Sequence, residues 1–291
     1  MKSKRRVVVV GAGLRTPVGN TLDQFVKSLK EGRSGICVMP AWNDVKRMRT
    51  RLAGLCHIEG EEEAIPRQYL RSMGRVAILA ALSAMDAVKA SGLTEEEIAS
   101  PICGVSYGST EGSIGSQMEY LRKMLLNRSL EGIPASWYLK CMSHTCAGNI
   151  SVLFHTRGPF IASCTACVSG SQGIGLGYEA IKAGKADIMI TGGAEEVDFL
   201  SAAVFDLMMA TSSNYNDRPA ESPRPFDADR DGLVVAEGAG TLILEEYERA
   251  RKRGAPILGE IEGFWSNGSG MRLTNSDARS MEECLLASLK D

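Results

Sequence analysis

The sequence predicts an α/β protein in which helices cover a parallel sheet. Short runs of aliphatic or β-branched residues alternate with longer helical patterns, and glycines follow several of these runs. Between residues 160 and 191 the order is strand, turn, helix and strand, which is the connection that parallel neighbours need. With 291 residues and 44% hydrophobic content, the chain can bury the large core that this class requires.

The first elements follow from local patterns near the start of the chain. Residues 6–10 predict a buried strand, and Gly11-Ala12-Gly13 is expected to close it in a tight turn. Asn20 or Thr21 then caps a helix that ends at Gly32. The apolar positions of this helix share one face and are Leu22, Phe25, Val26 and Leu29.

The alternation continues through the rest of the chain. Residues 71–89 are rich in aliphatic side chains and precede Gly92, which predicts a mostly buried helix. Thr94 and Glu97 have the spacing of a capping box. Further strands are expected at 103–107, 160–163, 187–191, 240–245 and 257–264, and further helices at 170–185 and 281–289.

Composition argues against several classes of partner. The 33 basic and 35 acidic residues give a formal net charge of −2, so no global field attracts nucleic acid or an anionic membrane surface. The longest purely aliphatic run, Val7 to Val10, is far shorter than the roughly 18 residues of a membrane span. The basic residues before it are not followed by a signal-peptide apolar region. We therefore expect a cytoplasmic protein with no membrane or nucleic-acid partner.

The eight cysteines are scattered and do not form the dense framework of a small secreted protein. We expect reduced thiols, most of them small core residues. Cys164 and Cys167 form a C-x-x-C pair, but Cys141 with Cys146 is a poor second half of a zinc site, so no metal is expected. A redox dithiol remains an alternative for the pair.

A dinucleotide site is an alternative interpretation of the first predicted turn. Gly11-Ala12-Gly13 follows a strand, as a dinucleotide-binding turn would. Thr16 occupies the third glycine position of that pattern, so a purely structural turn is favoured.

Cys167 alone has the setting of a nucleophile. The strand at 160–163 leads into a turn, and Cys167 stands where the next helix begins, among the small residues Ala166, Ser169 and Gly170. The positive end of a helix dipole lowers the pKa of a thiol and raises its thiolate fraction. Backbone N–H groups at the same terminus can stabilise the oxyanion of a thioester carbonyl. An inert buried cysteine is the competing interpretation.

Longer stretches then point to a family. Residues 158–170 are GPFIASCTACVSG and residues 186–195 are ADIMITGGAE. Segments 8–13, 16–19, 29–35, 216–217, 224–232 and 237–240 agree in order and spacing. In these motifs the chain resembles the elongating type I and II β-ketoacyl-acyl-carrier-protein synthases over essentially its whole length.

The resemblance implies a thiolase-like fold with αβαβα layers and a homodimer. Residues 1–254 would be the N-terminal half and residues 255–291 the beginning of the C-terminal half. Cys167 would take an acyl group from acyl-carrier protein or coenzyme A, and malonyl-carrier protein would lose carbon dioxide to give the attacking carbanion. No additional cofactor is implied.

The chain departs from the family pattern in its histidines. The family uses two histidines and a lysine for decarboxylation, whereas this sequence contains His57, His144 and His155, none in a His-Gly-Thr or Gly-His context. Its last residues, 280–291, resemble the helix before the first catalytic histidine. We therefore expect a truncated synthase that cannot condense alone, although Cys167 could still be acylated. His144 is better explained as a core or interface residue than as a catalytic one.

Five further residues acquire expected roles through the resemblance. Trp137 aligns with a residue that reaches across the dimer into the partner's acyl pocket, and Phe205 with an aromatic residue that lines the pocket. The large indole implies a preference for short or unusual acyl groups. Arg67, Arg71 and Arg75, at helical spacing, would dock the acidic carrier protein. Core packing for the aromatic residues and a solvated face for the arginines are the alternatives.

Two other functions remain open. The chain could be a non-catalytic partner that shapes the product in a heterodimer, although the nucleophile is often replaced there and Cys167 is retained. It could also be a thiol oxidoreductase that uses Cys164 and Cys167.

Overall fold

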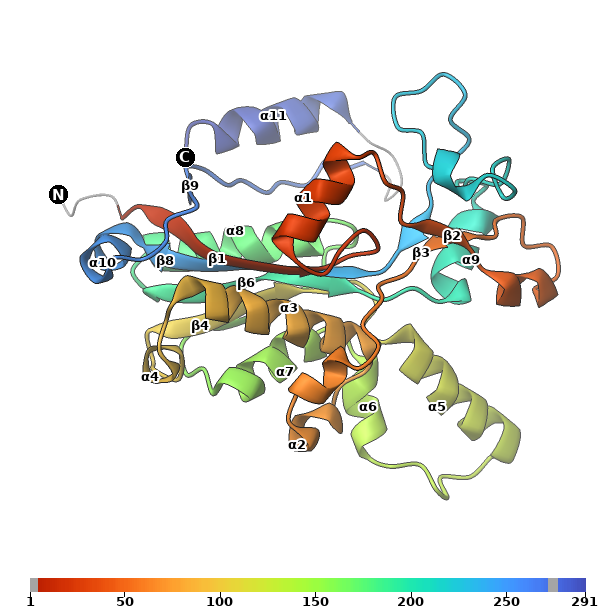
Figure 1. Cartoon of the computed structure of the whole chain (residues 1–291), viewed down its shortest axis with the longest axis horizontal. Helices are drawn as coiled ribbons and strands as arrows, with labels where there is room; N and C mark the ends of the chain where they lie inside the picture. Colours follow the sequence, from red (N-terminus) through yellow and green to blue (C-terminus); the bar gives the residue numbers. More distant parts are fainter. Residues whose placement is uncertain (1–4, 272–276) are drawn as a thin grey trace.

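A mixed sheet forms the centre of the computed structural model, which describes residues 5–271 and 277–291. Within these residues, six strands pair in the order β5-β4-β6-β8-β1-β9. Their bounds are β1 (Val7–Arg15), β4 (Cys103–Gly108), β5 (Phe160–Ser163), β6 (Ile188–Glu195), β8 (Gly238–Glu246) and β9 (Gly259–Ile261). Figure 1 shows the sheet between helices on both faces, so the architecture is α-β-α.

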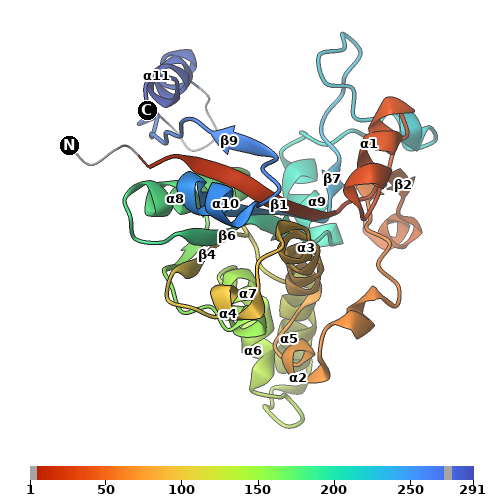
Figure 2. The same ribbon diagram turned by 60° about the vertical axis from the view of Figure 1, so that its left-hand side comes forward.

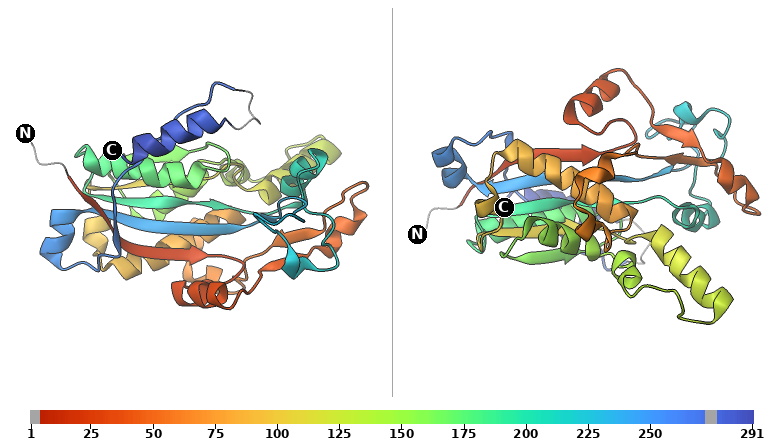
Figure 3. Two further views of the ribbon diagram at one scale, coloured as in Figure 1. Left: turned by 90° about the horizontal axis from the view of Figure 1, so that it is seen from above. Right: turned by 60° about the horizontal axis from the view of Figure 1, so that its bottom comes forward.

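Different helices cover the two faces of the sheet. On one face lie α3 (Arg75–Ser91) and α7 (Thr145–Phe154), and on the other lies α8 (Ser169–Lys182) (Figure 2). Beyond α8 runs α11 (Ala278–Ser288), as the view from above shows (Figure 3, left). Lys182 at the end of α8 pairs with Asp291 at 2.6 Å, which ties the end of the chain to this helix.

The remaining elements surround this framework. A second sheet pairs β2 (Ile36–Val38), β3 (Leu52–Gly54) and β7 (Val235–Ala236). The other helices are α1 (Leu22–Lys30), η1 (Pro40–Asp44), η2 (Glu61–Ala64), α2 (Arg67–Leu70), α4 (Glu95–Ile98), α5 (Ile114–Asn127), α6 (Ser136–Cys141), α9 (Phe199–Leu207), η3 (Pro219–Glu221) and α10 (Tyr247–Arg253). No helix in the described ranges combines the length and apolar character needed to cross a membrane.

The expectation of a parallel sheet is confirmed for one part of the sheet and wrong for the other. β4 runs parallel to both β5 and β6. β8 is antiparallel to β6 and to β1, and β9 is antiparallel to β1. The chain makes an excursion over residues 196–237 between β6 and β8, and it returns in the opposite direction. The strand–helix–strand order on which the prediction relied covers only the parallel part.

The predicted turn at Gly11-Ala12-Gly13 is wrong, because β1 continues through it to Arg15. Gly11 pairs with Ile243 and Gly13 with Thr241 of β8. These glycines are required by α3, since a Cβ at Gly13 would lie 2.1 Å from the carbonyl oxygen of Ser83. With no strand-to-helix turn here, the geometry of a dinucleotide site is absent from this segment.

Several local predictions are confirmed. The side chain of Thr21 caps α1, and Thr94 with Glu97 forms the capping box of α4. The strand β5 has the predicted bounds. α3 begins at Arg75, four residues later than predicted, because α2 is a separate short helix. The apolar face predicted for α1 lies at the surface of the described chain, where Leu29 is 59% exposed.

We predict that Gly13→Ala destabilises the fold by about 2 kcal/mol or more, because its methyl group would overlap the backbone of α3. Gly148→Ala is the control, since a Cβ there meets nothing within 4 Å and alanine is favoured in helix α7. Urea unfolding of both variants measures the difference. A Gly13→Ala protein as stable as the wild type would contradict the packing described.

Candidate active site

A strained elbow joins β5 to α8. Ala166 has φ 49°, in the left-handed region that costs a residue with a Cβ about 1 to 2 kcal/mol. Its carbonyl oxygen accepts hydrogen bonds from Thr110 Oγ1 (2.9 Å), Ser169 Oγ (2.7 Å) and Ser169 N (3.0 Å). Ser169 Oγ in turn accepts from Thr165 N at 2.9 Å. These bonds hold the elbow in its unfavourable conformation.

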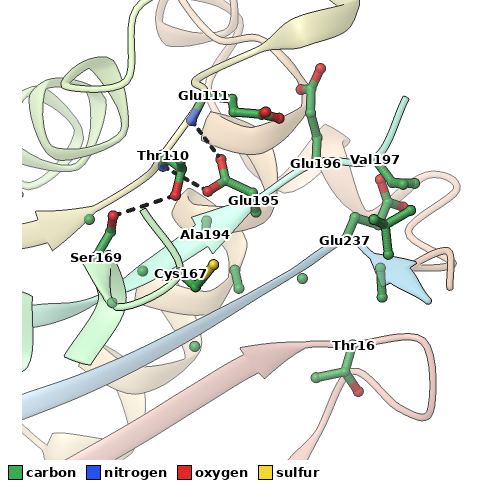
Figure 4. Close-up of a pocket in the computed structure, with 18 of the residues that line it drawn as sticks. Thr16, Thr110, Glu111, Cys167, Ser169, Ala194, Glu195, Glu196, Val197 and Glu237 are labelled. Atoms are coloured by element: carbon green, nitrogen blue, oxygen red, sulfur yellow. Dashed lines mark hydrogen bonds between the residues drawn. The ribbon is translucent and has the colours of Figure 1, made fainter. Parts of the chain in front are cut away.

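Cys167 follows this elbow and precedes the first turn of α8. Its side chain is exposed and lines a cavity of about 860 Å³ (Figure 4). Val168 is the N-cap of this 14-residue helix, so Cys167 lies at the positive end of the helix dipole. The expected strand-to-helix elbow is therefore present, and its thiol is open to a ligand.

The neighbouring thiol has a different environment. Cys164 is also exposed, but its Sγ donates to the carbonyl oxygen of Thr110 at 3.4 Å. Of these two thiols, Cys167 is the one that lines the cavity.

Three of the eight cysteines are buried, so the expectation that most of them are small core residues is wrong. Cys56, Cys103 and Cys146 are at most 1% exposed. Burial raises the pKa of each of these thiols to about 12, so their thiolate fraction at neutral pH is very small.

Glu195 supports the elbow from the end of β6. Its carboxylate accepts hydrogen bonds from Ser109 Oγ (2.9 Å), Thr110 N (2.7 Å) and Glu111 N (3.2 Å), which holds the loop after β4 beside the elbow (Figure 4). This role of Glu195 was not predicted from the sequence. Glu195 lies at the carboxyl end of β6, which is parallel to β4 (residues 103–108). Because the carboxyl ends of parallel strands meet at one edge of a sheet, its position in the sequence could have indicated a role near the loop after β4.

Arg75 forms an ion pair with Glu237 of the same chain. Its guanidinium donates from Nε to Glu237 Oε2 (2.7 Å) and from Nη2 to Glu237 Oε1 (2.5 Å). Glu237 is 3% exposed and lines the cavity. The Arg75 side chain is nevertheless 42% exposed, and Arg67 and Arg71 are exposed at the two ends of α2, so docking by these three arginines stays a prediction.

The two predicted aromatic residues lie in different places. Phe205, in α9, lines the cavity of Cys167. Trp137, in α6, packs edge-on against Tyr120 of α5, with ring centroids 6.5 Å apart, and Lys123 Nζ lies 4.2 Å from its ring centroid. Trp137 is not among the residues that line the cavity of its own chain.

The three histidines lie outside the cavity lining. His57 Nδ1 is 3.9 Å from Glu59, and His144 is exposed at the start of α7. His155 ends α7 and contacts Tyr69 Oη at 3.3 Å. Across the two described ranges, no group of three or more His, Cys, Asp or Glu side chains is arranged to hold a metal ion.

With this geometry established, comparison with known proteins identifies the family. Residues 4–250 match the family model of the β-ketoacyl synthase N-terminal domain. The chain therefore belongs to the β-ketoacyl synthase family.

Individual relatives agree. The chain is 33% identical over 281 residues to 3-oxoacyl-acyl-carrier-protein synthase 1 of Haemophilus influenzae, covering 97% of this chain and 69% of that one. It is 36% identical over 274 residues to 3-oxoacyl-acyl-carrier-protein synthase 2 of Vibrio cholerae, covering 94% and 66%. The chain thus spans about two thirds of the length of these relatives.

Solved structures confirm the predicted thiolase-like fold class. A β-ketoacyl synthase from Burkholderia phymatum superposes with a TM-score of 0.93 at 40% identity, over 98% of this chain and 70% of that chain. The ishigamide ketosynthase/chain length factor superposes with a TM-score of 0.89 at 26% identity, over 99% and 70%.

We predict that iodoacetamide at neutral pH modifies Cys164 and Cys167 at least about 100-fold faster than Cys103 and Cys146, because burial denies the latter both access and ionisation. Peptide mass spectrometry measures each site. The raised pKa keeps the buried thiols protonated until the pH approaches about 12, so raising the pH to 9 should not make iodoacetamide label them. Comparable labelling of Cys146 in the folded protein would contradict this environment.

Proposed function

We propose that Cys167 accepts an acyl group from a thioester, and that this is the first step of a condensation with malonyl-acyl-carrier protein that gives a β-ketoacyl product in fatty-acid or polyketide-like synthesis. The observation that carries the proposal is an exposed thiol at the start of α8 that opens into a cavity of about 860 Å³. The names of the relatives, 3-oxoacyl-acyl-carrier-protein synthases, support the same reaction class.

The first half-reaction uses groups that the described chain contains. The thiolate of Cys167 attacks the thioester carbonyl, and the negative charge on the carbonyl oxygen is stabilised near the N–H groups that begin α8. The carbonyl then re-forms as the carrier thiolate leaves and takes up a proton. An acyl group on Cys167 and a free carrier thiol are the products.

The second half-reaction needs decarboxylation. Malonyl-carrier protein loses carbon dioxide, and the resulting carbanion attacks the acyl carbonyl and releases the thiolate of Cys167. None of the three histidines lines the cavity. We therefore expect the 291-residue chain to be acylated without condensing.

Carrier protein and a second copy of the chain are the proposed partners, in the cytoplasm. One similar solved structure, at 26% identity, is a type II polyketide-synthase acyl-carrier protein in complex with its ketosynthase. β5 lies at the edge of the described sheet and exposes Phe160, which supports pairing of two copies.

A partner subunit of a heterodimer is the second candidate, since one similar structure is a ketosynthase/chain length factor. The retained, exposed Cys167 counts against that role. For the thiol oxidoreductase, the separate surroundings of Cys164 and Cys167 count against a working pair.

Intact-mass and peptide analysis after incubation with an acyl thioester tests the function. We expect one acyl group on Cys167, loss of labelling in Cys167→Ala, and retention in the matched control Cys164→Ala. A reversible loss of two hydrogens, without acylation, would instead indicate the oxidoreductase.

Charge reversal at Arg71 tests docking. An exposed arginine should attract the acidic carrier protein. Arg71→Glu should therefore raise the apparent KM for acyl-carrier protein about 3- to 10-fold and leave the apparent KM for a coenzyme A thioester unchanged. Arg279→Glu, on the exposed face of α11, is the control. Equal effects on both substrates would argue against a docking role.

Chain-length preference tests Trp137. If its indole closes the partner's acyl pocket, Trp137→Ala should shift acylation of the dimer toward longer chains by about 10-fold. Tyr138→Ala, on the same helix and 55% exposed, is the matched control. An unchanged chain-length profile would leave Trp137 with a packing role against Tyr120.

A further inference from the structure

The cavity of Cys167 has an uneven electrostatic lining. Four carboxylates lie in its wall, and the lining contains no lysine, arginine or histidine side chain among the described residues. These carboxylates belong to Glu111, Glu195, Glu196 and Glu237. Figure 4 shows Glu111, Glu195 and Glu196 together on one side of the pocket, with Cys167 between them and Thr16.

Three of the four carboxylates have structural partners. Glu195 binds the loop after β4 through two backbone N–H groups and Ser109. Glu196 accepts from Val76 N (2.9 Å) and Gly115 N (2.7 Å). Glu237 pairs with Arg75. Their oxygens are used to hold the wall together.

Glu111 differs from these three. It follows Thr110, whose hydroxyl group holds the elbow, so its side chain is carried by the same loop that positions Cys167. Its carboxyl group interacts with the hydroxyl group of Ser201 and with the charges of Glu195 and Glu196, and no lysine, arginine or histidine among the described residues forms an ion pair with it. Partial burial, and then the charge of Glu195, raise the pKa of Glu111.

A plain alkyl chain would be a poor occupant beside this carboxyl group. It would displace water from Glu111 and offer no hydrogen bond in return. An acyl chain with a hydroxyl or ammonium group would donate a hydrogen bond to Glu111 in place of the one lost with the water. Apolar residues elsewhere in the wall, including Ile174 and Phe205, suit the methylene part of such a chain.

We propose that Glu111 is a specificity-determining residue, which selects acyl groups whose chain carries a hydrogen-bond donor, a hydroxyl or an ammonium group. This inference rests on the proposed acylation of Cys167.

The test uses acyl-pantetheine thioesters that differ only in a terminal methyl, hydroxyl or amino group, in series from short to medium length. The initial rate of acylation of Cys167 is followed by mass spectrometry. In the wild type, the hydroxyl or amino member should react at least about 10-fold faster than the methyl member at one or more lengths.

Variants then assign the preference to Glu111. Glu111→Leu should bring the ratio to within about 2-fold, because the acceptor is gone. Glu111→Gln keeps an acceptor for a hydroxyl group but loses the charge that pairs with an ammonium group, so the two variants distinguish the two donors. Glu119→Gln makes the same charge change on exposed α5, where Glu119 pairs with Lys123, and should leave all ratios unchanged.

Equal or faster reaction of the methyl member at every length would overturn the proposal. So would an unchanged ratio in Glu111→Leu, or, if that variant does not fold, an unchanged ratio in Glu111→Ala, which also removes the acceptor. Failure of every thioester to acylate wild-type Cys167 would be a different result, because it would remove the proposed function itself and the selectivity with it.

Discussion

The carbonyl oxygen of Ala166 is the point on which the site depends. A left-handed alanine is unfavourable by itself, and three hydrogen bonds to one oxygen atom hold it in place. One of these bonds comes from Thr110, whose loop is held by Glu195 at the end of β6. Residues from three separate segments thus set the position of the Cys167 thiol. The backbone strain is confined to Ala166, whereas the hydrogen bonds that stabilise it involve the loop after β4, the end of β6 and the start of α8.

Close approach between α8 and the sheet makes this support possible. A Cβ at Gly108 would lie 2.2 Å from the carbonyl oxygen of Ser169, and one at Gly193 would lie 2.6 Å from the Cα of Gly170. The absence of side chains at Gly108 and Gly193 therefore lets the first turn of α8 rest on β4 and β6. Because β4, β5 and β6 are parallel, their carboxyl ends meet at one edge, which is where the cavity opens.

The cysteines show how far tertiary context changes one kind of side chain. Cys103 and Cys146 behave as core residues whose ionisation is suppressed by burial, whereas Cys167 faces a cavity at a helix terminus. Local sequence placed Cys167 at the elbow, because a short strand, small residues and a helix follow each other there. Local sequence could not separate the surroundings of Cys164 from those of Cys167, because that difference arises from the loop at Thr110, more than fifty residues away.

The sequence by itself determined the elements with strong local causes, such as the caps at Thr21 and Thr94, the strand β5 and the elbow before α8, and its motifs carried the family resemblance. Only the tertiary structure decided what glycines 11 and 13 do, since their role comes from α3 packing on the strand and not from a turn. It also decided the mixed direction of the sheet and the pairing of Arg75 with the buried carboxylate of Glu237. The physical reason is that caps and strands depend on neighbours within a few residues, whereas close packing and long-range ion pairs join segments that the chain order keeps far apart.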